Sequence, residues 1–508
     1  MRKLRRSVGI TAVAAVAMGA AIVAAQFATA DPTSDLVWKA CPNAPDDLKC
    51  TTVEVPLGYA EPNGEKIKIG LAKQPATDPG KRIGSLLFDP GGPGGSGVSV
   101  LARKKIGTEK LRERFDVIGF DPRGINTSTQ IQCEQADMDA VLEFGQPTTQ
   151  ERFDALGKAN HKLAEGCRKL TGPLFDHADN LHTVEDIERV RQALGEGKLN
   201  FLGFSYGTLM GQQYAEKYPG NIRSMVLDGN MDHSLESNYH FASSQLAPVE
   251  RNFTSFANWC DTTETCALYG QDTKKVYGEL REKARNGELV DPETGAKIDF
   301  YKFSDYGFSA NVPAKWATLG ASLKALRDGQ GTADVKAAAT PRSGANYVFQ
   351  TMFCSDFGLR IESYDEWKQI TGKLAEDHPN VQWSNYVSNM NECIGGSIPY
   401  TNKRKPLEID GAPPLVMLGN LNDFATSYEW SQTAAEQSGA TLLTYEGYNH
   451  SVYGLRGSTC IEEPVDAYFI DLRKPGNGIS CPALEKPDGT GSKADELGGL
   501  TDGPYSLD

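Results

Sequence analysis

The sequence has few of the residues that metal, phosphate or nucleic-acid chemistry requires. Histidine occurs only seven times in 508 residues, and no H-E-x-x-H or similar cluster appears, which argues against metal catalysis. The ten cysteines include no C-x-x-C pair, so a zinc or redox centre is not indicated. Asp and Glu outnumber Lys and Arg by 66 to 52, and the resulting formal charge of -14 disfavours binding to nucleic acid or anionic membranes. We therefore expect no cofactor and no metal.

Long hydrophobic runs are also missing after the N-terminus, where no stretch is apolar enough to span a bilayer. The first 30 residues combine a basic start, an apolar stretch from Val8 to Ala25 and the A-x-A site Ala28-Thr29-Ala30, which together predict a cleaved signal peptide. A membrane anchor is the alternative, but the small residues at the exit favour cleavage. We expect a secreted monomer that starts near Asp31, with residues 31–40 as an arm or short propeptide. Loss of four basic residues lowers its charge to about -18, which favours a substrate with a cationic end such as a free amino group.

An even number of cysteines in an exported chain predicts disulfides. The sequence does not fix their connectivity, but the cysteines fall into neighbours along the chain. We therefore expect sequential pairing: Cys41–Cys50, Cys133–Cys167, Cys260–Cys266, Cys354–Cys393 and Cys460–Cys481.

Short apolar runs alternate with helical patterns through much of the chain. Residues 181–194 show the apolar stripe of an amphipathic helix, beginning with Leu181, and residues 66–72 alternate as an edge strand does. Further strands are expected at 83–88, 115–120, 199–204, 222–227, 414–418 and 441–445. This alternation predicts an α/β fold, with a doubly wound and mostly parallel sheet.

The alternation of expected strands and helices stops between residues 232 and 406, where helical patterns near 246–285 and 363–375 dominate. We interpret 232–406 as an inserted, mainly helical cap. The core would then comprise 41–231 and 407–482. The tail, 483–508, is rich in Gly, Asp, Lys and Pro and is expected to be flexible.

A serine motif stands at the centre of this pattern. Gly203-Phe204-Ser205-Tyr206-Gly207 matches G-x-S-x-G, which places a serine nucleophile on a sharp strand-to-helix turn with glycines that leave room for the bend. An ordinary serine in a βα turn fits the bare motif equally well. The apolar run before it and the helical pattern after it supply the setting that a nucleophile needs.

Such a nucleophile requires an acid and a histidine later in the chain, in the order Ser, Asp or Glu, His. His450 lies in a loop directly after the last apolar strand, where the general base belongs. Asp423 follows the preceding strand and would accept the Nδ1–H of His450. A surface histidine and a helix N-cap are the alternative roles for these two residues. We predict Ser205, Asp423 and His450 as the catalytic triad.

An oxyanion hole needs two backbone donors. The N–H of Tyr206, at the start of a helix, is one candidate. The loop Gly91-Gly92-Pro93-Gly94-Gly95 suits the second, with Gly92 preferred and Gly91 as the alternative. A phosphate-binding loop is the rival interpretation, but no Gly-Lys-Ser/Thr follows the glycines.

Together these motifs resemble the secreted tripeptidyl aminopeptidases of actinomycetes, relatives of proline iminopeptidase. The resemblance covers nearly all of the mature chain and rests on these segments: Gly91–Gly95, Asp121-Pro122-Arg123-Gly124, Gly203–Thr208, Asp423 with Thr426, His450, and the C-terminal Cys460, Tyr468 and Cys481. It implies an α/β-hydrolase fold, the same triad, and release of short peptides, often tripeptides, from free N-termini.

Two departures from the resemblance matter. Pro90 stands where proline iminopeptidases have His, which argues against a pure proline iminopeptidase. Around the acid, Phe424 and Ser427 replace the more usual prolines, which concerns the shape of the loop only.

An exopeptidase must also capture the substrate amine, and a cap carboxylate would do so through a charge-assisted hydrogen bond. The candidates are Glu236, Asp356 and Glu362, and for each of them the role of an ordinary solvated acid is favoured over that of an anchor. We predict a secreted serine exopeptidase that acts on peptide and protein N-termini. A carboxylesterase or a proline iminopeptidase-like enzyme on the same fold is the alternative. A catalytically inactive surface-binding protein is the alternative from another class.

Overall fold

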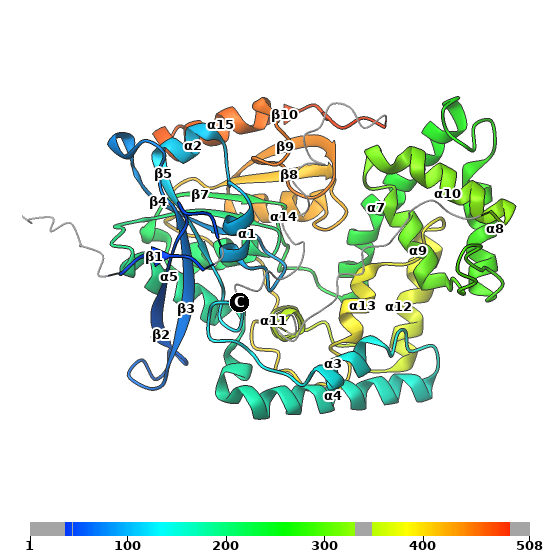
Figure 1. Ribbon diagram of the computed structural model, residues 1–508, viewed down its shortest axis with the longest axis horizontal. Helices are drawn as coiled ribbons and strands as arrows, with labels where there is room; N and C mark the ends of the chain where they lie inside the picture. Colours follow the sequence, from blue (N-terminus) through cyan, green and yellow to red (C-terminus); the bar gives the residue numbers. More distant parts are fainter. Residues whose placement is uncertain (1–35, 43, 331–347, 488–508) are drawn as a thin grey trace, which may run out of the picture. The chain divides into compact units, whose positions relative to one another are not determined.

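A ten-stranded sheet organises the part of the chain that the computed structural model describes, residues 36–42, 44–330 and 348–487 (Figure 1). The predicted signal peptide, residues 31–35 and residues 488–508 of the predicted tail lie outside the described residues. In spatial order the strands are β1 (Lys39–Ala40), β2 (Lys49–Pro56), β3 (Lys66–Gln74), β5 (Phe115–Phe120), β4 (Gly84–Asp89), β6 (Leu199–Phe204), β7 (Ile222–Asp228), β8 (Val416–Asn422), β9 (Thr441–Tyr448) and β10 (Ser480–Cys481).

The sheet is antiparallel at its beginning and parallel elsewhere. Strands β1, β2, β3 and β5 pair antiparallel, and every further neighbour from β5 to β10 pairs parallel. All six residues of both β4 and β6 are buried, because helices cover both faces of a parallel sheet. The predicted mostly parallel α/β sheet is confirmed.

One strand prediction was wrong. The segment Lys66–Ala72 belongs to β3, which lies between β2 and β5 rather than at an edge. Only its second half, from Leu71, pairs with β5, so the lysines of the first half stay exposed and alternate with buried isoleucines. This partial pairing produces an edge-like sequence pattern in an internal strand.

Helices pack on both faces of the sheet. Leu86 and Phe88 of β4 join a core with α1, α2 and α15, whereas Leu87 joins the opposite core with α5, α6 and α14. The α-helices before β7 and after β8 are α1 (Gly97–Arg103), α2 (Glu109–Arg114), α3 (Gln135–Leu142), α4 (Gln150–Thr171), α5 (Asn180–Ala193), α6 (Gly207–Lys217), α14 (Tyr428–Ser438) and α15 (Thr459–Asp471). Leu181 departs from the predicted stripe of α5, because it is 42% exposed in the first turn of that helix.

Helices also make up most of the described chain between β7 and β8. Within this stretch we call residues 232–406 the cap segment, which runs from green to yellow in Figure 1. Its bounds as a separate domain stay a prediction. The helices are α7 (Asn238–Thr262), α8 (Thr273–Arg285), α9 (Phe300–Ser309), α10 (Trp316–Asp328), α11 (Val348–Phe357), α12 (Tyr364–Asp377) and α13 (Asn385–Asn391). Throughout the described ranges, none of the helices is long and apolar enough to cross a membrane.

All five disulfides form in the predicted sequential order, so each one closes a short stretch of chain. Cys460–Cys481 ties the short strand β10 back to α15, and Cys354–Cys393 links α11 to the segment that follows α13. The cysteine spacing was therefore sufficient to indicate the partners, because close neighbours in sequence remain close in the fold.

Candidate active site

Ser205 occupies a sharp turn between β6 and α6. Its backbone has a φ of +55°, a conformation that non-glycine residues rarely adopt. The flanking glycines are required by space: a Cβ at Gly203 would lie 2.6 Å from the carbonyl oxygen of Gly207, and a Cβ at Gly207 would lie 2.6 Å from Oδ1 of Asp89. This is the strained strand–turn–helix geometry that presents a serine hydroxyl.

Asp423 and His450 form a close pair after β8 and β9. The Nδ1 atom of His450 lies 2.9 Å from Oδ2 and 3.0 Å from Oδ1 of Asp423. Asp423 is fully buried, and its Oδ1 also accepts the N–H groups of Ala425 and Thr426 at 2.8 and 2.9 Å. These backbone bonds fix the carboxylate, so that it can hold the imidazole in one tautomer and one orientation.

The charges around the imidazole favour its protonated form. Burial lowers the pKa of His450, but the negative charges of Asp423 and Asp228 outweigh it and raise the pKa overall, with Arg456 opposing them. Nε2 is buried and has no hydrogen-bond partner within the described residues. An imidazole held by a carboxylate on one nitrogen and open on the other is suited to act as a general base.

Asp228, at the end of β7, links Ser205 to the loop of His450. Its carbonyl oxygen accepts the N–H of Ser205 at 3.0 Å and the hydroxyl of Ser451 at 3.3 Å. Its Oδ2 accepts the N–H groups of Val452 and Tyr453 at 2.9 and 2.8 Å. Burial raises the pKa of Asp228 to about 6, although these hydrogen bonds oppose the shift.

The structure thus pairs Asp423 with His450 and connects Ser205 to the residue that follows His450. No hydrogen bond joins Ser205 Oγ to His450 Nε2 across the described part of the chain. Catalytic hydrogen bonds are commonly long before substrate binds, so this geometry is compatible with a triad.

The glycine loop lies against the serine turn. A Cβ at Gly91 would come within 2.9 Å of the nitrogen of Tyr206 and 2.8 Å of Cβ of Ser205. The N–H of Gly91 donates to Oδ1 of Asp89 at 2.8 Å, whereas the amides of Gly92 and Tyr206 donate no hydrogen bond to any described residue. Of the two glycines predicted as donors, Gly92 therefore has the available N–H.

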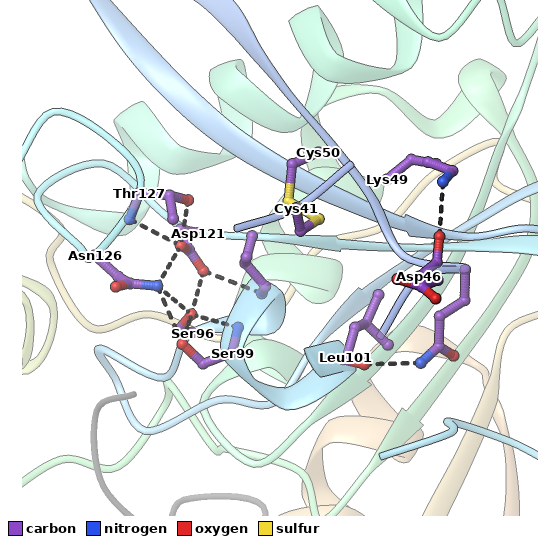
Figure 2. Close-up of a disulfide and its surroundings, with 12 residues drawn as sticks. Cys41, Asp46, Lys49, Cys50, Ser96, Ser99, Leu101, Asp121, Asn126 and Thr127 are labelled. Carbon is purple, nitrogen blue, oxygen red and sulfur yellow. Dashed lines mark hydrogen bonds between the residues drawn. A yellow bond between two sulfur atoms is a disulfide. The ribbon is translucent and has the colours of Figure 1, made fainter. Parts of the chain in front are cut away.

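A buried carboxylate holds the far end of this loop (Figure 2). Oδ1 of Asp121 accepts the hydroxyl of Ser96 at 2.6 Å and the N–H of Val98 at 3.2 Å. Its Oδ2 accepts Asn126 Nδ2 at 3.0 Å and the Thr127 hydroxyl at 2.6 Å. Asp121 thereby joins the start of α1, which follows the glycine loop, to the loop after β5.

The three predicted amine-binding acids lie in different surroundings. Glu236 and Glu362 are exposed, and the carboxylate of Glu362 lies 3.9 Å from the guanidinium of Arg360. Asp356 of α11 is fully buried and accepts a hydrogen bond from the hydroxyl of Tyr206, the residue after Ser205.

The carboxylate of Asp356 is already occupied by protein donors. Its Oδ1 also accepts the Asn180 N–H at 3.0 Å and the Asn402 amide at 2.9 Å. Burial raises its pKa to about 7. Asp356 therefore connects the cap segment to the serine turn, and its role as an amine anchor stays a prediction.

The fold and the site agree with the family to which the chain belongs. Residues 84–454 match the family described as alpha/beta hydrolase fold, and the protein is a member of it.

The chain is 29% identical to the tripeptidyl aminopeptidase of Streptomyces lividans, over 92% of this chain and 89% of the relative. It is 27% identical to serine protease Hip1 of Mycobacterium tuberculosis, over 93% and 96%. A protein of Mycobacterium tuberculosis named carboxylesterase B is 28% identical, over 85% and 86%. These findings confirm the predicted α/β-hydrolase fold and the resemblance to actinomycete tripeptidyl aminopeptidases, and they support a serine peptidase.

Sequence reasoning missed Asp228 and Asp89, the two buried carboxylates beside the serine turn. Each ends a parallel strand directly before a Gly or Pro-Gly turn, and that position is a usable signal, since the carboxyl ends of parallel strands face the ligand-binding side. The pKa of Asp89 is raised well above its usual value by burial, with only the Gly91 N–H opposing. The cap side chains that contact the site left no local signal in the sequence.

Proposed function

We propose that the protein is an exported serine exopeptidase that releases short peptides, expected to be tripeptides, from free N-termini. Ser205 is the nucleophile, His450 the general base and Asp423 the acid that orients it. The observation that carries the proposal is the pairing of the buried Asp423 with His450, on loops that Asp228 connects to the strained turn of Ser205.

In the proposed reaction each of these residues has one role. His450 Nε2 accepts the proton of the Ser205 hydroxyl while Oγ attacks the scissile carbonyl carbon. The N–H groups of Gly92 and Tyr206 donate to the oxyanion, which stabilises the tetrahedral intermediate. His450 then protonates the leaving amine, and an acyl-enzyme remains. Water, deprotonated by His450, hydrolyses the ester and frees the N-terminal peptide.

The names of the relatives support peptide substrates, because two of the three are peptidases. Export is supported by the five disulfides, which persist in oxidising compartments. Nothing in the triad itself selects an amide over an ester, and the similarity to carboxylesterase B favours ester hydrolysis as the second candidate function.

Chromogenic anilides of di-, tri- and tetrapeptides, each with a free and an acetylated amine, test the proposal. We expect the free tripeptide to be cleaved fastest and acetylation to abolish most of the turnover. Equal turnover of blocked and free peptides would remove the exopeptidase assignment but leave the peptidase. Hydrolysis of simple esters alone would favour the esterase. Labelling by a fluorophosphonate should be lost in Ser205→Ala, and labelling that persists would exclude Ser205 as the nucleophile.

A further inference from the structure

The segment that bears Asp423 is hydrogen-bonded to the cap segment through residues before and after Asp423 in the sequence. Backbone carbonyl oxygens of the end of β8 and the turn after it, which we call the acid loop (residues 420–426), accept hydrogen bonds from four cap side chains. The pairs are Arg251 to Leu421 at 3.1 Å, Asn252 to Asn422 at 3.0 Å, Gln245 to Phe424 at 2.6 Å and Tyr386 to Ala425 at 2.6 Å.

We infer that the cap segment positions the catalytic acid, with Gln245, Asn252 and Tyr386 as positioning residues for Asp423. The inference rests on the proposed function of Asp423 and extends it, because the cap segment would then be a structural part of the triad's support.

The donors themselves are held rigidly, which is what positioning requires. Gln245 is buried, and its amide oxygen accepts the hydroxyl of Ser384 at 2.6 Å, so its NH2 group has a fixed direction. Asn252 is fully buried, and its Nδ2 atom donates to Asn311 as well as to the acid loop. Neither side chain can turn away without leaving a buried polar group unpaired, which is unfavourable.

Tyr386 is fixed by aromatic packing. Its ring stacks on Trp430 at a centroid distance of 6.1 Å and packs against Phe241 at 5.0 Å. Its hydroxyl therefore reaches the carbonyl of Ala425 from a constrained ring. The N–H of Ala425 donates to Oδ1 of Asp423 at 2.8 Å, so a shift of Ala425 moves the carboxylate directly.

The cap segment also contacts the other two catalytic loops, so its contact with the acid loop is part of a continuous support. Asp356 of α11 accepts the hydroxyl of Tyr206 in the serine turn. Trp316 of α10 packs edge-on against Tyr448, two residues before His450, at 5.7 Å.

Tyr386→Phe tests the inference, because it removes only the hydroxyl. Tyr364→Phe is a matched control. Tyr364 is also a partly buried cap tyrosine that donates to a backbone carbonyl at 2.6 Å, but its acceptor, Thr148, lies outside the acid loop, the serine turn and the loop of His450. We expect kcat to fall about tenfold in Tyr386→Phe with KM changed less than about twofold, since displaced catalytic groups mainly affect the transition state. The control should retain its kcat within about twofold.

The pH profile separates positioning from a merely structural role. The charged groups that act on His450 are Asp423 and Asp228, which raise its pKa, and Arg456, which lowers it. If Asp423 is displaced, its contribution weakens and the pKa of His450 falls. Because only the neutral imidazole is a base, the acidic limb of kcat/KM should move to lower pH in Tyr386→Phe and stay in place in Tyr364→Phe.

Gln245→Met provides a second variant of similar volume, and all proteins are assayed well below their melting temperatures. The wild-type enzyme is first shown to react with a fluorophosphonate at Ser205, and a failure here would refute the proposed function rather than this inference. With an active wild type, unchanged kcat and an unchanged acidic limb in both variants would overturn the inference. The inference would also be overturned if kcat falls in Tyr386→Phe only in proportion to the loss of folded protein while kcat of Gln245→Met equals that of the wild type.

Discussion

Replacing Asp423 by Asn tests the core of the proposed mechanism with almost no change in shape. Oδ1 of Asp423 accepts two backbone N–H groups, from Ala425 and Thr426, so the carboxamide oxygen must stay in that place. The NH2 group is then forced into the position of Oδ2, which lies 2.9 Å from His450 Nδ1. An NH2 group only donates, so Nδ1 must present its lone pair and the proton must move to Nε2.

That tautomer cannot accept the proton of Ser205. In the alternative tautomer Nδ1 of His450 stays protonated, so its N–H faces the NH2 group of the new carboxamide, and two donors oppose each other. The carboxamide oxygen would then have to accept a third hydrogen bond. From the effect of the same change in a serine protease triad, we expect kcat to fall about 10⁴-fold, equivalent to roughly 5.5 kcal/mol of transition-state stabilisation.

The assay is steady-state hydrolysis of the free tripeptide anilide, with thermal unfolding as the measure of folding. Asp232→Asn is the matched control, because Asp232 is also a buried acid shortly after a strand. Its Oδ1 accepts hydrogen bonds from the N–H and the hydroxyl of Ser234, and it has no role in the proposed mechanism. The control should keep kcat within about twofold. A loss below about tenfold in Asp423→Asn, with Ser205 still labelled, would refute the tautomer argument.

Three further predictions concern the same site and its support. Gly91→Ala should lower kcat/KM at least about 100-fold in the anilide assay, because the new Cβ would lie 2.4 Å from the carbonyl oxygen of Phe204 and displace the glycine loop. Gly94→Ala is the control, because Gly94 has a similar φ but its Cβ would have its nearest neighbour at 3.7 Å, so kcat/KM should fall much less. Equal losses of kcat/KM would contradict the steric argument. The pKa of Asp228 is about 6 in the folded protein and 3.8 in the unfolded chain, so the folded state binds more protons between these values, and stability falls as pH rises from about 4 to about 6. Of the roughly 3 kcal/mol lost over this range, about 1.4 kcal/mol is lost between pH 5 and 8. Asp228→Asn should remove this difference in urea titrations at pH 5 and 8, and an unchanged difference would show that the carboxyl is not the cause. Replacing Cys133 and Cys167 by Ser opens a loop with a sequence separation of 34 and should lower the free energy of unfolding by about 4 kcal/mol. Denaturant titration measures this change. A change near zero would mean that other contacts keep the two ends of the loop together when the disulfide is absent.

Local patterns in the sequence were enough for the features that depend on local chemistry. The apolar run before Ser205 and the glycines around it predict the turn, because strand burial and the room for a sharp bend are properties of neighbouring residues. The positions of Asp423 and His450 after successive strands predict that they meet, since the ends of parallel strands share one edge of a sheet. The internal position of β3 could not be found this way, because its exposed half imitates an edge.

Only the tertiary structure decided how the site is supported. Gln245 and Phe424 are 179 residues apart, and nothing in the chain between them indicates that one amide will meet the other's carbonyl. The same holds for Asp356 and Tyr206, which are 150 residues apart. Periodicity and motifs report the preferences of neighbouring residues, whereas these contacts arise from the packing of the cap segment on the core. The sequence by itself therefore determined the fold class and the candidate triad, whereas the folded chain established the disulfide pairs and the contacts that support the candidate triad.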